Sequence, residues 1–364
     1  MKRFAPSIIL LCLLLVSDNI FCQSEIEGDS LQQADKKIKN TLFQNDTIIP
    51  LVLNGNIREL FNDRSEEPAY HNMKLIFEKE LSVWDTSDIE MRTRGHFRKL
   101  NCTYPPLLIN FKDDNPFTRK FGKTGKLKLV MPCKDESYVI REWLVYKLYN
   151  IITPYSLQAI LVQLKMNDTK KGKSYPAMFG ILLENEKQMA ERNQQKIIKQ
   201  KKNPELVEQQ NFLRMAVFQY LIGNTDWSIQ YLQNIILMAA DSTSKPLAVA
   251  YDFDHSGMVS APYAYPAEDL KMSSVVERRY RGYCITDLTV YRPVIEEYNL
   301  HKTKIYSLYN NCKLIESKYK NFIVKYLDDF YKTINNPALF KKEFLYPCDK
   351  NGTGNVIIKG LRKE

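Results

Sequence analysis

Two short acidic motifs carry the side chains that could do chemistry in this chain. Residues 223–227 read Gly-Asn-Thr-Asp-Trp, and residues 251–254 read Tyr-Asp-Phe-Asp. Sites that transfer a phosphoryl group from a nucleotide use one Asp to position the acceptor hydroxyl. An Asn and a second Asp then hold Mg²⁺ against the phosphates. The two motifs therefore predict phosphoryl-transfer chemistry.

Each predicted role falls on a particular side chain. Asp226 is the candidate catalytic residue, and Asn234, eight positions later, is a candidate metal ligand. Protein kinases place the corresponding Asn about five positions after the Asp, so the interval here is longer. Asp252 is the first-ranked metal ligand, and Asp254 joins it because alternation along a strand puts both on one face. The competing interpretation is a helix-to-hairpin junction with surface acids.

Strand-like patterns dominate the first half of the chain. Apolar and polar residues alternate, or short apolar runs occur, over 48–53, 73–78, 89–94, 107–111, 126–130, 159–165 and 177–183. Residues 138–151 have helical spacing, and residues 113–125 are expected to form a polar loop. These elements predict a strand-rich N-lobe over residues 48–185.

Helical patterns dominate the second half. Residues 186–210 are charged and mostly helix-favouring, residues 212–222 form an apolar helix, and residues 303–331 have helical spacing. This predicts a helical C-lobe over residues 186–364 that carries both acidic motifs. The expected fold class is α+β, with two lobes.

The first 22 residues have the features of a secretory signal peptide. Lys2 and Arg3 precede a short apolar run, residues 8–16, and polar residues follow. The run is too short to span a membrane. Cleavage is expected after Cys22, followed by a flexible leader over residues 23–47. Lipidation of Cys22 is the alternative, disfavoured by the bulky Phe21. We expect a periplasmic, cell-surface or secreted protein without a transmembrane helix.

Composition argues against a nucleic-acid partner. The 364 residues carry a net charge of +10, but Lys and Arg total 52 against 42 Asp and Glu, and the excess is spread along the chain. The densest basic run, residues 196–202, has no interleaved aromatic residues and is expected to be a solvated helical loop.

Five of the seven cysteines remain after the predicted cleavage, namely Cys102, Cys133, Cys284, Cys312 and Cys348. Export to an oxidising compartment favours pairing, although an odd number leaves at least one thiol free. Cys102 and Cys133 flank the strands over residues 107–130, so a disulfide between them is expected, with buried free thiols as the alternative. The absence of Cys-x-x-Cys pairs and the presence of only four histidines disfavour a structural zinc site.

Further motifs accompany the two acids in a set order. They are residues 51–57, 62–64, 92–98 with its Arg-Gly-x-x-Arg run, 126–129, 140–142 and 180–184. Over roughly residues 48–260, this order resembles the kinase-like family of spore-coat protein H, in its secreted bacterial branch. The resemblance implies an atypical kinase fold that binds ATP and Mg²⁺ or Mn²⁺, some of whose members phosphorylate proteins.

A phosphate-binding cation is expected on the strand over residues 126–130. Lys128 or Lys126 could serve, because alternation puts both on the face opposite Leu127 and Leu129. Such a lysine is usually oriented by a helix glutamate, and Glu142 lies on the next predicted helix. Solvated surface charges are the alternative.

Three further residues are candidate nucleotide contacts. Arg94 and Arg98, beside Gly95, could bind phosphates through bidentate hydrogen bonds. Glu184 ends an apolar strand where a nucleotide-binding hinge would lie. The competing interpretation is a set of solubilising charges at strand edges and ends.

Three functions compete. The first is an exported atypical kinase acting on a protein or cell-envelope acceptor. The second is a catalytically inactive, pseudokinase-type binding or scaffold protein, which the long interval between Asp226 and Asn234 favours. The third is a metal-dependent hydrolase using Asp226, Asp252 and Asp254, which would need more histidine ligands than the chain has.

Overall fold

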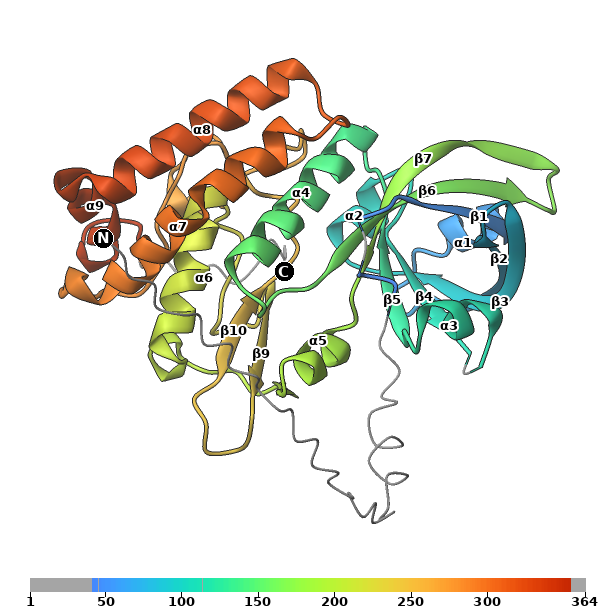
Figure 1. Ribbon diagram of the computed structural model, residues 1–364, viewed down its shortest axis with the longest axis horizontal. Coiled ribbons are helices and arrows are strands. Elements are labelled where there is room, and N and C mark those ends of the chain that lie inside the picture. The colour runs from blue at the N-terminus through green and yellow to red at the C-terminus, as the bar shows by residue number, and fades with distance from the viewer. Residues whose placement is uncertain (1–40, 45, 113, 355–364) are drawn as a thin grey trace, which may run out of the picture. The chain divides into compact units, whose positions relative to one another are not determined.

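The computed structural model describes residues 41–354, except residues 45 and 113 (Figure 1). The predicted signal peptide, its cleavage site and most of the predicted leader lie outside the described residues. Within the described part of the chain, no helix is both long and apolar enough to cross a membrane.

Seven strands close into a barrel in the order β1-β2-β3-β4-β5-β7-β6 (Figure 1). Six neighbouring pairs are antiparallel, and the parallel pairing of β1 with β6 closes the ring. The strands are β1 Ile49–Gly55, β2 His71–Glu80, β3 Val83–Thr93, β4 Leu107–Phe111, β5 Lys126–Val130, β6 Ala159–Asp168 and β7 Lys173–Leu183.

The barrel interior is filled by the apolar residues that alternate along these strands. Leu107, Ile109 and Phe111 of β4, for example, are buried, whereas the residues between them are half-buried. All seven predicted strands are confirmed, and the region before residue 185 is strand-rich as expected. Closure into a barrel was not predicted, and a closed barrel differs from the N-lobe of an ordinary protein kinase.

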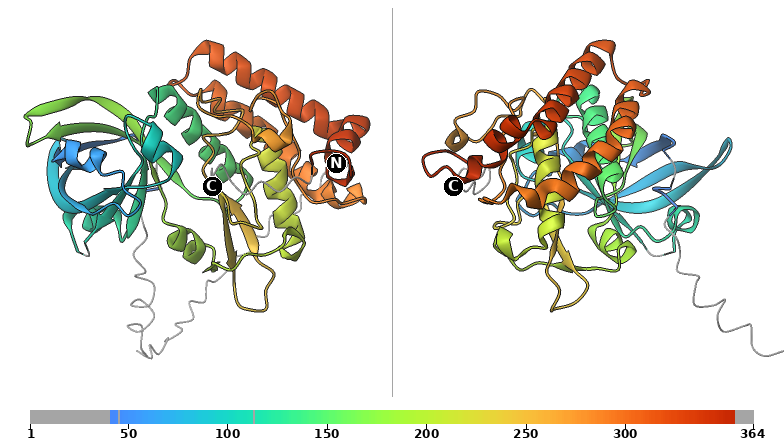
Figure 2. Two further views of the ribbon diagram at one scale, coloured as in Figure 1. Left: turned by 180° about the vertical axis from the view of Figure 1, so that it is seen from behind. Right: turned by 60° about the vertical axis from the view of Figure 1, so that its left-hand side comes forward.

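A second apolar core lies among the later helices. Helix α4, Glu136–Ile152, contacts the outer face of β6 and β7, and α7, Arg292–Asn310, contacts α4. Figure 2 shows α7 beside α8, Ser317–Asn335. The remaining helices are α1 Ile57–Asn62, α2 Phe97–Asn101, α3 Pro116–Phe121, α5 Glu186–Arg192, α6 Gln209–Ile222 and α9 Pro337–Phe344.

A small second sheet includes the hairpin that separates the two acidic motifs. Its strands, β8 Lys196–Ile198, β9 Ile235–Ala239 and β10 Leu247–Ala250, lie in the order β10-β9-β8. Asp226 precedes the antiparallel hairpin of β9 and β10, and Asp252 follows it. A hairpin therefore separates the two acids in sequence.

Three predicted segments were wrong in detail. Residues 113–125 contain α3, because Asn115 and Thr118 form a capping box and Phe117 is buried in the barrel core. Between residues 186 and 208 the helical segments are α5 and a short 3₁₀ helix, Pro204–Leu206, and the basic run enters β8 because its backbone pairs with β9. The helical segment over 303–331 is interrupted between α7 and α8.

Two disulfides join cysteines of the described residues. The predicted pair, Cys102 with Cys133, is confirmed, with its Cα atoms 4.6 Å apart. Cys284 and Cys348 form a second disulfide that was not predicted, across 64 positions of sequence. Cys312 is the free cysteine of the part of the chain that the structure describes. The first disulfide ties the end of α2 to the segment between β5 and α4.

Loss of either disulfide should destabilise the fold. The double changes Cys102→Ser with Cys133→Ser, and Cys284→Ser with Cys348→Ser, should each lower the free energy of unfolding by about 2–4 kcal/mol, because the unfolded chain loses a cross-link. Urea denaturation measures this effect. The matched control, Cys312→Ser, should change it by less than about 0.5 kcal/mol. A double variant as stable as this control would contradict the prediction.

Candidate functional site

The loop that carries Asp226 is fixed by hydrogen bonds within itself. Helix α6 ends at Gly223, whose φ of +67° is readily adopted by glycine. The buried Asn224 then donates to the side chain of Gln219 at 3.0 Å and accepts from the backbone N–H of Asp226 at 3.0 Å. The position of Asp226 therefore follows from the end of α6.

The long interval between Asp226 and Asn234 is taken up by a tight turn. Ser228 and Gln233 exchange two backbone hydrogen bonds, of 3.0 and 2.9 Å, which closes residues 229–232 into a loop. Asn234 is thereby returned to Asp226, and its amide donates to the carboxylate at 3.0 Å and to the main-chain oxygen at 2.7 Å. Gln233 donates to the other carboxylate oxygen of Asp226.

Asp252 and Asp254 lie beyond the end of β10. Asp252 has a φ of +64° and lies outside the strand. Strand alternation therefore does not apply to the two acids, and the reason given for placing them on one face was wrong. The backbone N–H of Asp252 donates to the hydroxyl of Tyr146 at 3.0 Å, and Tyr263 donates to Asp254 at 3.1 Å. Burial raises the pKa of Asp252, and the negative charge of Asp254 raises it further. The two carboxylates therefore act on one another electrostatically.

A buried arginine connects these acids to the rest of the fold. The Arg98 guanidinium on α2 lies 3.4 Å from Glu142 Oε2 and 3.5 Å from Asp254 Oδ2, and it also donates to the carbonyl of Met131. Burial raises the pKa of Glu142 to about 8, and the charge of Arg98 opposes that shift. Arg98 thus faces two buried carboxylates, rather than serving only as the phosphate contact that the sequence suggested.

The predicted pair of Lys128 with Glu142 is not formed. Glu142 instead faces Arg98, and Lys128 pairs with Glu186 at the start of α5, with its ammonium 4.7 Å from the centre of the Tyr251 ring. Burial lowers the pKa of Lys128, and the positive charge of Arg94 lowers it further. The predicted alternation in β5 is confirmed, because Leu127 and Leu129 are buried on the opposite face.

Arg94 lies near the same charges. Its positive charge lowers the pKa of Asp252, although burial and Asp254 raise it more. The backbone N–H of Arg94 donates to Pro106 at 2.9 Å. Arg94 also lines a cavity of about 390 Å³ with Arg92 and Lys99. The structure therefore brings Arg94 and Lys128 within electrostatic reach of Asp252.

Glu184 is engaged in a bidentate ion pair. Its two carboxylate oxygens lie 3.0 and 2.9 Å from Nε and Nη2 of Arg192, and its backbone N–H donates to Gln158 at 2.9 Å. This ion pair explains why the carboxylate of Glu184 can be buried without any bound ligand. Glu184 nevertheless lines the same cavity as Lys126 and Lys128, which has a volume of about 970 Å³.

Oxygen donors suited to a hard cation are present beside this cavity. Carboxylates and amide oxygens are ligands that Mg²⁺ accepts, and Asp252, Asp254 and Asn234 offer them. The mutual repulsion of Asp252 and Asp254 fits a cation near them. Within residues 41–354, apart from 45 and 113, no three His, Cys, Asp or Glu side chains form a group that could hold a metal ion.

Several residues of the site had no signal in the sequence. Helix α5 brings Glu186 to the site, and the turn closed by Ser228 and Gln233 brings Gln233 there. Arg281 donates to the main-chain oxygens of Thr225 and Trp227, the latter at 3.0 Å. Its charge opposes the rise in the pKa of Asp226 that burial causes. None of these contacts follows from spacing along the chain.

Comparison with known proteins gives little further guidance. No protein-family model matches the chain, and no curated protein matches its sequence. Among solved structures, the chain is similar to the Helicobacter pylori proinflammatory kinase CtkA, with 12% identity, over 67% of this chain and 93% of that one. The TM-score is 0.36. A similarity at this level carries no argument about activity.

Removal of the buried arginine should be strongly destabilising. Arg98→Met leaves Glu142 and Asp254 buried without their cation, which should cost about 3–5 kcal/mol of unfolding free energy. Adding Glu142→Gln should recover part of that loss when unfolding is measured at a pH well above 8, where the Glu142 carboxyl would otherwise be charged. Both effects can be measured by urea denaturation.

The control is Arg292→Met, which removes an exposed ion pair with Glu296. It should change the unfolding free energy by about 1 kcal/mol or less. Equal effects of Arg98→Met and Arg292→Met would show that the buried ion pairs do not hold the site together.

Proposed function

We propose that the chain is an exported, atypical kinase-like phosphotransferase that uses ATP with Mg²⁺ or Mn²⁺ and acts on a protein or cell-envelope acceptor. The observation that carries the proposal is the cavity of about 970 Å³ lined by Lys126, Lys128 and Glu184. Its lysine Lys128 interacts electrostatically with Asp252. A basic cavity thus adjoins the acidic motif.

The cavity has the size and charge that a nucleotide requires. Ligand pockets usually measure about 300–1,000 Å³. The lining of this one has six lysines, namely Lys123, Lys126, Lys128, Lys187, Lys196 and Lys199, against three glutamates, Glu184, Glu186 and Glu191. In this proposal Lys128 and Arg94 bind phosphate oxygens, since both lie within electrostatic reach of Asp252. Lys128 would then exchange its contact with Glu186 for one with phosphate.

The acids take separate roles in the proposal. Asp252, with Asp254 and Asn234, would hold the metal ion, which would supply positive charge to neutralise the phosphate oxygens. Asp226 would accept a hydrogen bond from the acceptor hydroxyl and position it. The turn closed by Ser228 and Gln233 brings Asn234 next to Asp226, so both residues can belong to one site despite their separation in sequence.

Export is part of the same proposal. The two disulfides among the described residues support it, because disulfides persist in oxidising compartments and are rare in the cytosol of most organisms. The order of charged, apolar and polar residues in the first 22 positions supports it independently.

A pseudokinase-type binding protein is the second candidate, and two contacts favour it. Both carboxylate oxygens of Asp226 already accept hydrogen bonds, from Gln233 and Asn234. Lys128 pairs with Glu186 instead of Glu142. In this alternative the cavity still binds a ligand, but no phosphoryl group is transferred at the site of Asp226.

The two central acids should have separable roles. Asp252→Asn should abolish both Mg²⁺-dependent ATP binding and transfer, because it removes the metal ligand. Asp226→Asn should keep ATP binding and lower transfer by about 10²-fold or more, because positioning acts on the acceptor. Thermal stabilisation by ATP measures binding, and label transfer from γ-labelled ATP to the chain itself and to an envelope fraction measures turnover.

The matched control is the exposed Asp269, whose change to Asn should alter neither quantity. Binding without transfer in the unchanged chain would favour the pseudokinase candidate. If both acid variants behaved as Asp269→Asn does in both assays, the acids would be ordinary polar residues and the proposed function would fail.

A further inference from the structure

Three cations line the cavity of about 390 Å³ at the edge of the candidate site. They are Arg92 near the end of β3, Arg94 just after it, and Lys99 of α2. Within the part of the chain that the structure describes, none of the three forms an ion pair with a carboxylate. Like charges repel one another, so an anion from outside would stabilise all three. Arg94 already has a part in the proposed phosphate binding, whereas Arg92 and Lys99 have none.

The guanidinium of Arg92 is positioned but not bonded. It lies over the ring of Tyr70, 5.0 Å from the ring centre, and the side chain is half-buried. Among the described residues the guanidinium has no hydrogen-bond acceptor, and only its Nε is buried. The two terminal nitrogens are therefore the atoms that a ligand can reach. Two parallel N–H groups of this kind match the two oxygens of a carboxylate.

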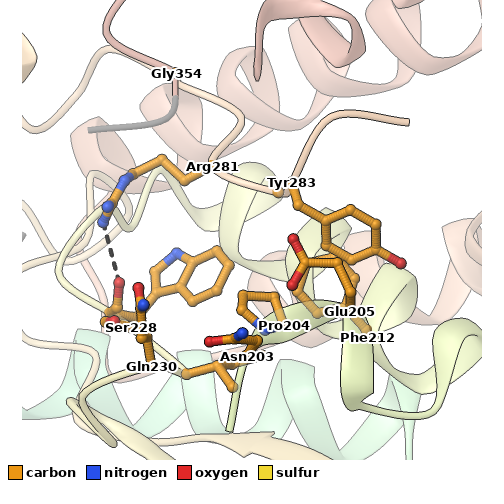
Figure 3. A pocket seen from close by; sticks show the side chains of 12 residues that line it. Asn203, Pro204, Glu205, Phe212, Ser228, Gln230, Arg281, Tyr283 and Gly354 are labelled. Carbon is orange, nitrogen blue, oxygen red and sulfur yellow. Dashed lines mark hydrogen bonds between the residues drawn. The ribbon is translucent and has the colours of Figure 1, made fainter. Parts of the chain in front are cut away.

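The arginine of another cavity differs in this respect. That cavity lies beside the loop that follows Asp226 and has a volume of about 300 Å³ (Figure 3). Arg281 there donates to the main-chain oxygens of Thr225 and Trp227. Its hydrogen bonds hold the loop in place, so this guanidinium has a structural role. The contacts of Arg92 include no such bond, and the arginine suited to an external anion is Arg92.

Lys99 adds positive charge to the cavity without needing to touch the ligand. It is only 7% exposed, and its ammonium donates to the main-chain oxygen of Ser65. A buried cation without a counter-ion is costly, and an anion in the cavity would reduce that cost. Glu66 and Glu67 also line the cavity, but both are exposed, so water screens their charges. The net charge of +10 of the whole chain favours an anionic partner as well.

The sheet register gives the distance from this cavity to the proposed phosphate site. Arg92 is paired with Leu108 of β4, and Leu108 is paired with Lys128 of β5. Neighbouring strands lie about 4.8 Å apart, so the backbones of Arg92 and Lys128 are about 10 Å apart on the outer face of the barrel. An extended polypeptide advances about 3.3 Å per residue. The cavity would therefore receive a side chain about three residues away from the hydroxyl group that accepts the phosphate.

We propose that this cavity binds an acidic side chain, Asp or Glu, of a polypeptide acceptor. The carboxylate would accept two hydrogen bonds from the terminal nitrogens of Arg92, and the charge of Lys99 would stabilise it. A basic side chain would add to the repulsion, and a neutral one would leave the three cations uncompensated. The small volume suits one side chain and not a row of nucleic-acid phosphates. The inference rests on the proposed function, because it names the acceptor of that same site.

The test uses short peptides of alanine and glycine with one central serine. A single Glu, Gln or Lys is moved from position to position on either side of the serine. Label transfer from γ-labelled ATP gives KM and kcat, and fluorescence anisotropy with a non-hydrolysable ATP analogue and Mg²⁺ gives Kd without any transfer. Glu about three residues from the serine should lower KM and Kd about tenfold relative to Gln, with kcat little changed, because the contact is distant from the reacting group.

Arg92→Glu provides a readout that loss of folding cannot imitate. It should reverse the preference, so that the Lys peptide binds more tightly than the Glu peptide. The matched control is Arg292→Glu, which makes the same change in net charge at an exposed ion pair on α7 and should keep the preference for Glu.

Three results would overturn the inference. They are equal binding of Glu and Gln peptides by the unchanged chain, a preference for Glu that survives Arg92→Glu, and binding of inorganic phosphate without any peptide preference. Binding that prefers Glu and depends on Arg92, but without label transfer, would contradict the proposed function and still support this site. Label transfer without a preference for Glu would contradict this inference and leave the proposed function standing.

Discussion

The candidate site depends on one buried cation, Arg98. Its guanidinium lies between Glu142 on α4 and Asp254 beyond β10, so it joins the helix and the acidic loop. Either carboxylate, buried without a cation, would carry a large desolvation cost. The disulfide between Cys102 and Cys133 ties α2, which carries Arg98, to the segment before α4. Arg98 pairs with Glu142, and Lys128 pairs with Glu186 at the basic cavity.

Much of the local fold could be predicted from the sequence, because each strand alternates over its own few residues. Strands β4 and β5 have the predicted bounds. Closure of the barrel could not be predicted, since it depends on parallel pairing of β1 with β6, about a hundred positions apart. Helix α3 was missed because its capping residues, Asn115 and Thr118, are of types that favour turns as well as helix ends. Strand β8 was missed because three residues acquire strand geometry only from the neighbouring β9.

The residues of the candidate site could be predicted from the sequence better than the pairs that they form. Alternation correctly put Lys128 on the face of β5 opposite the barrel core. Its partner depended on tertiary packing, because Arg98, Glu142 and Glu186 come from three different helices. The interval between Asp226 and Asn234 seemed too long for one site, yet a turn that pairs Ser228 with Gln233 removes the extra residues. Sequence spacing therefore measures distance poorly wherever the chain forms such a turn.

The central claim is that the basic cavity binds a nucleotide whose metal ion lies at Asp252. Calorimetric titration with a non-hydrolysable ATP analogue, with and without Mg²⁺, tests it most directly. We expect binding that requires Mg²⁺ and is lost in Lys128→Met. The control, Lys74→Met, removes an exposed lysine of β2 paired with Asp88 and should bind as the unchanged chain does. Absence of binding, or binding that depends on neither Mg²⁺ nor Lys128, would contradict the claim.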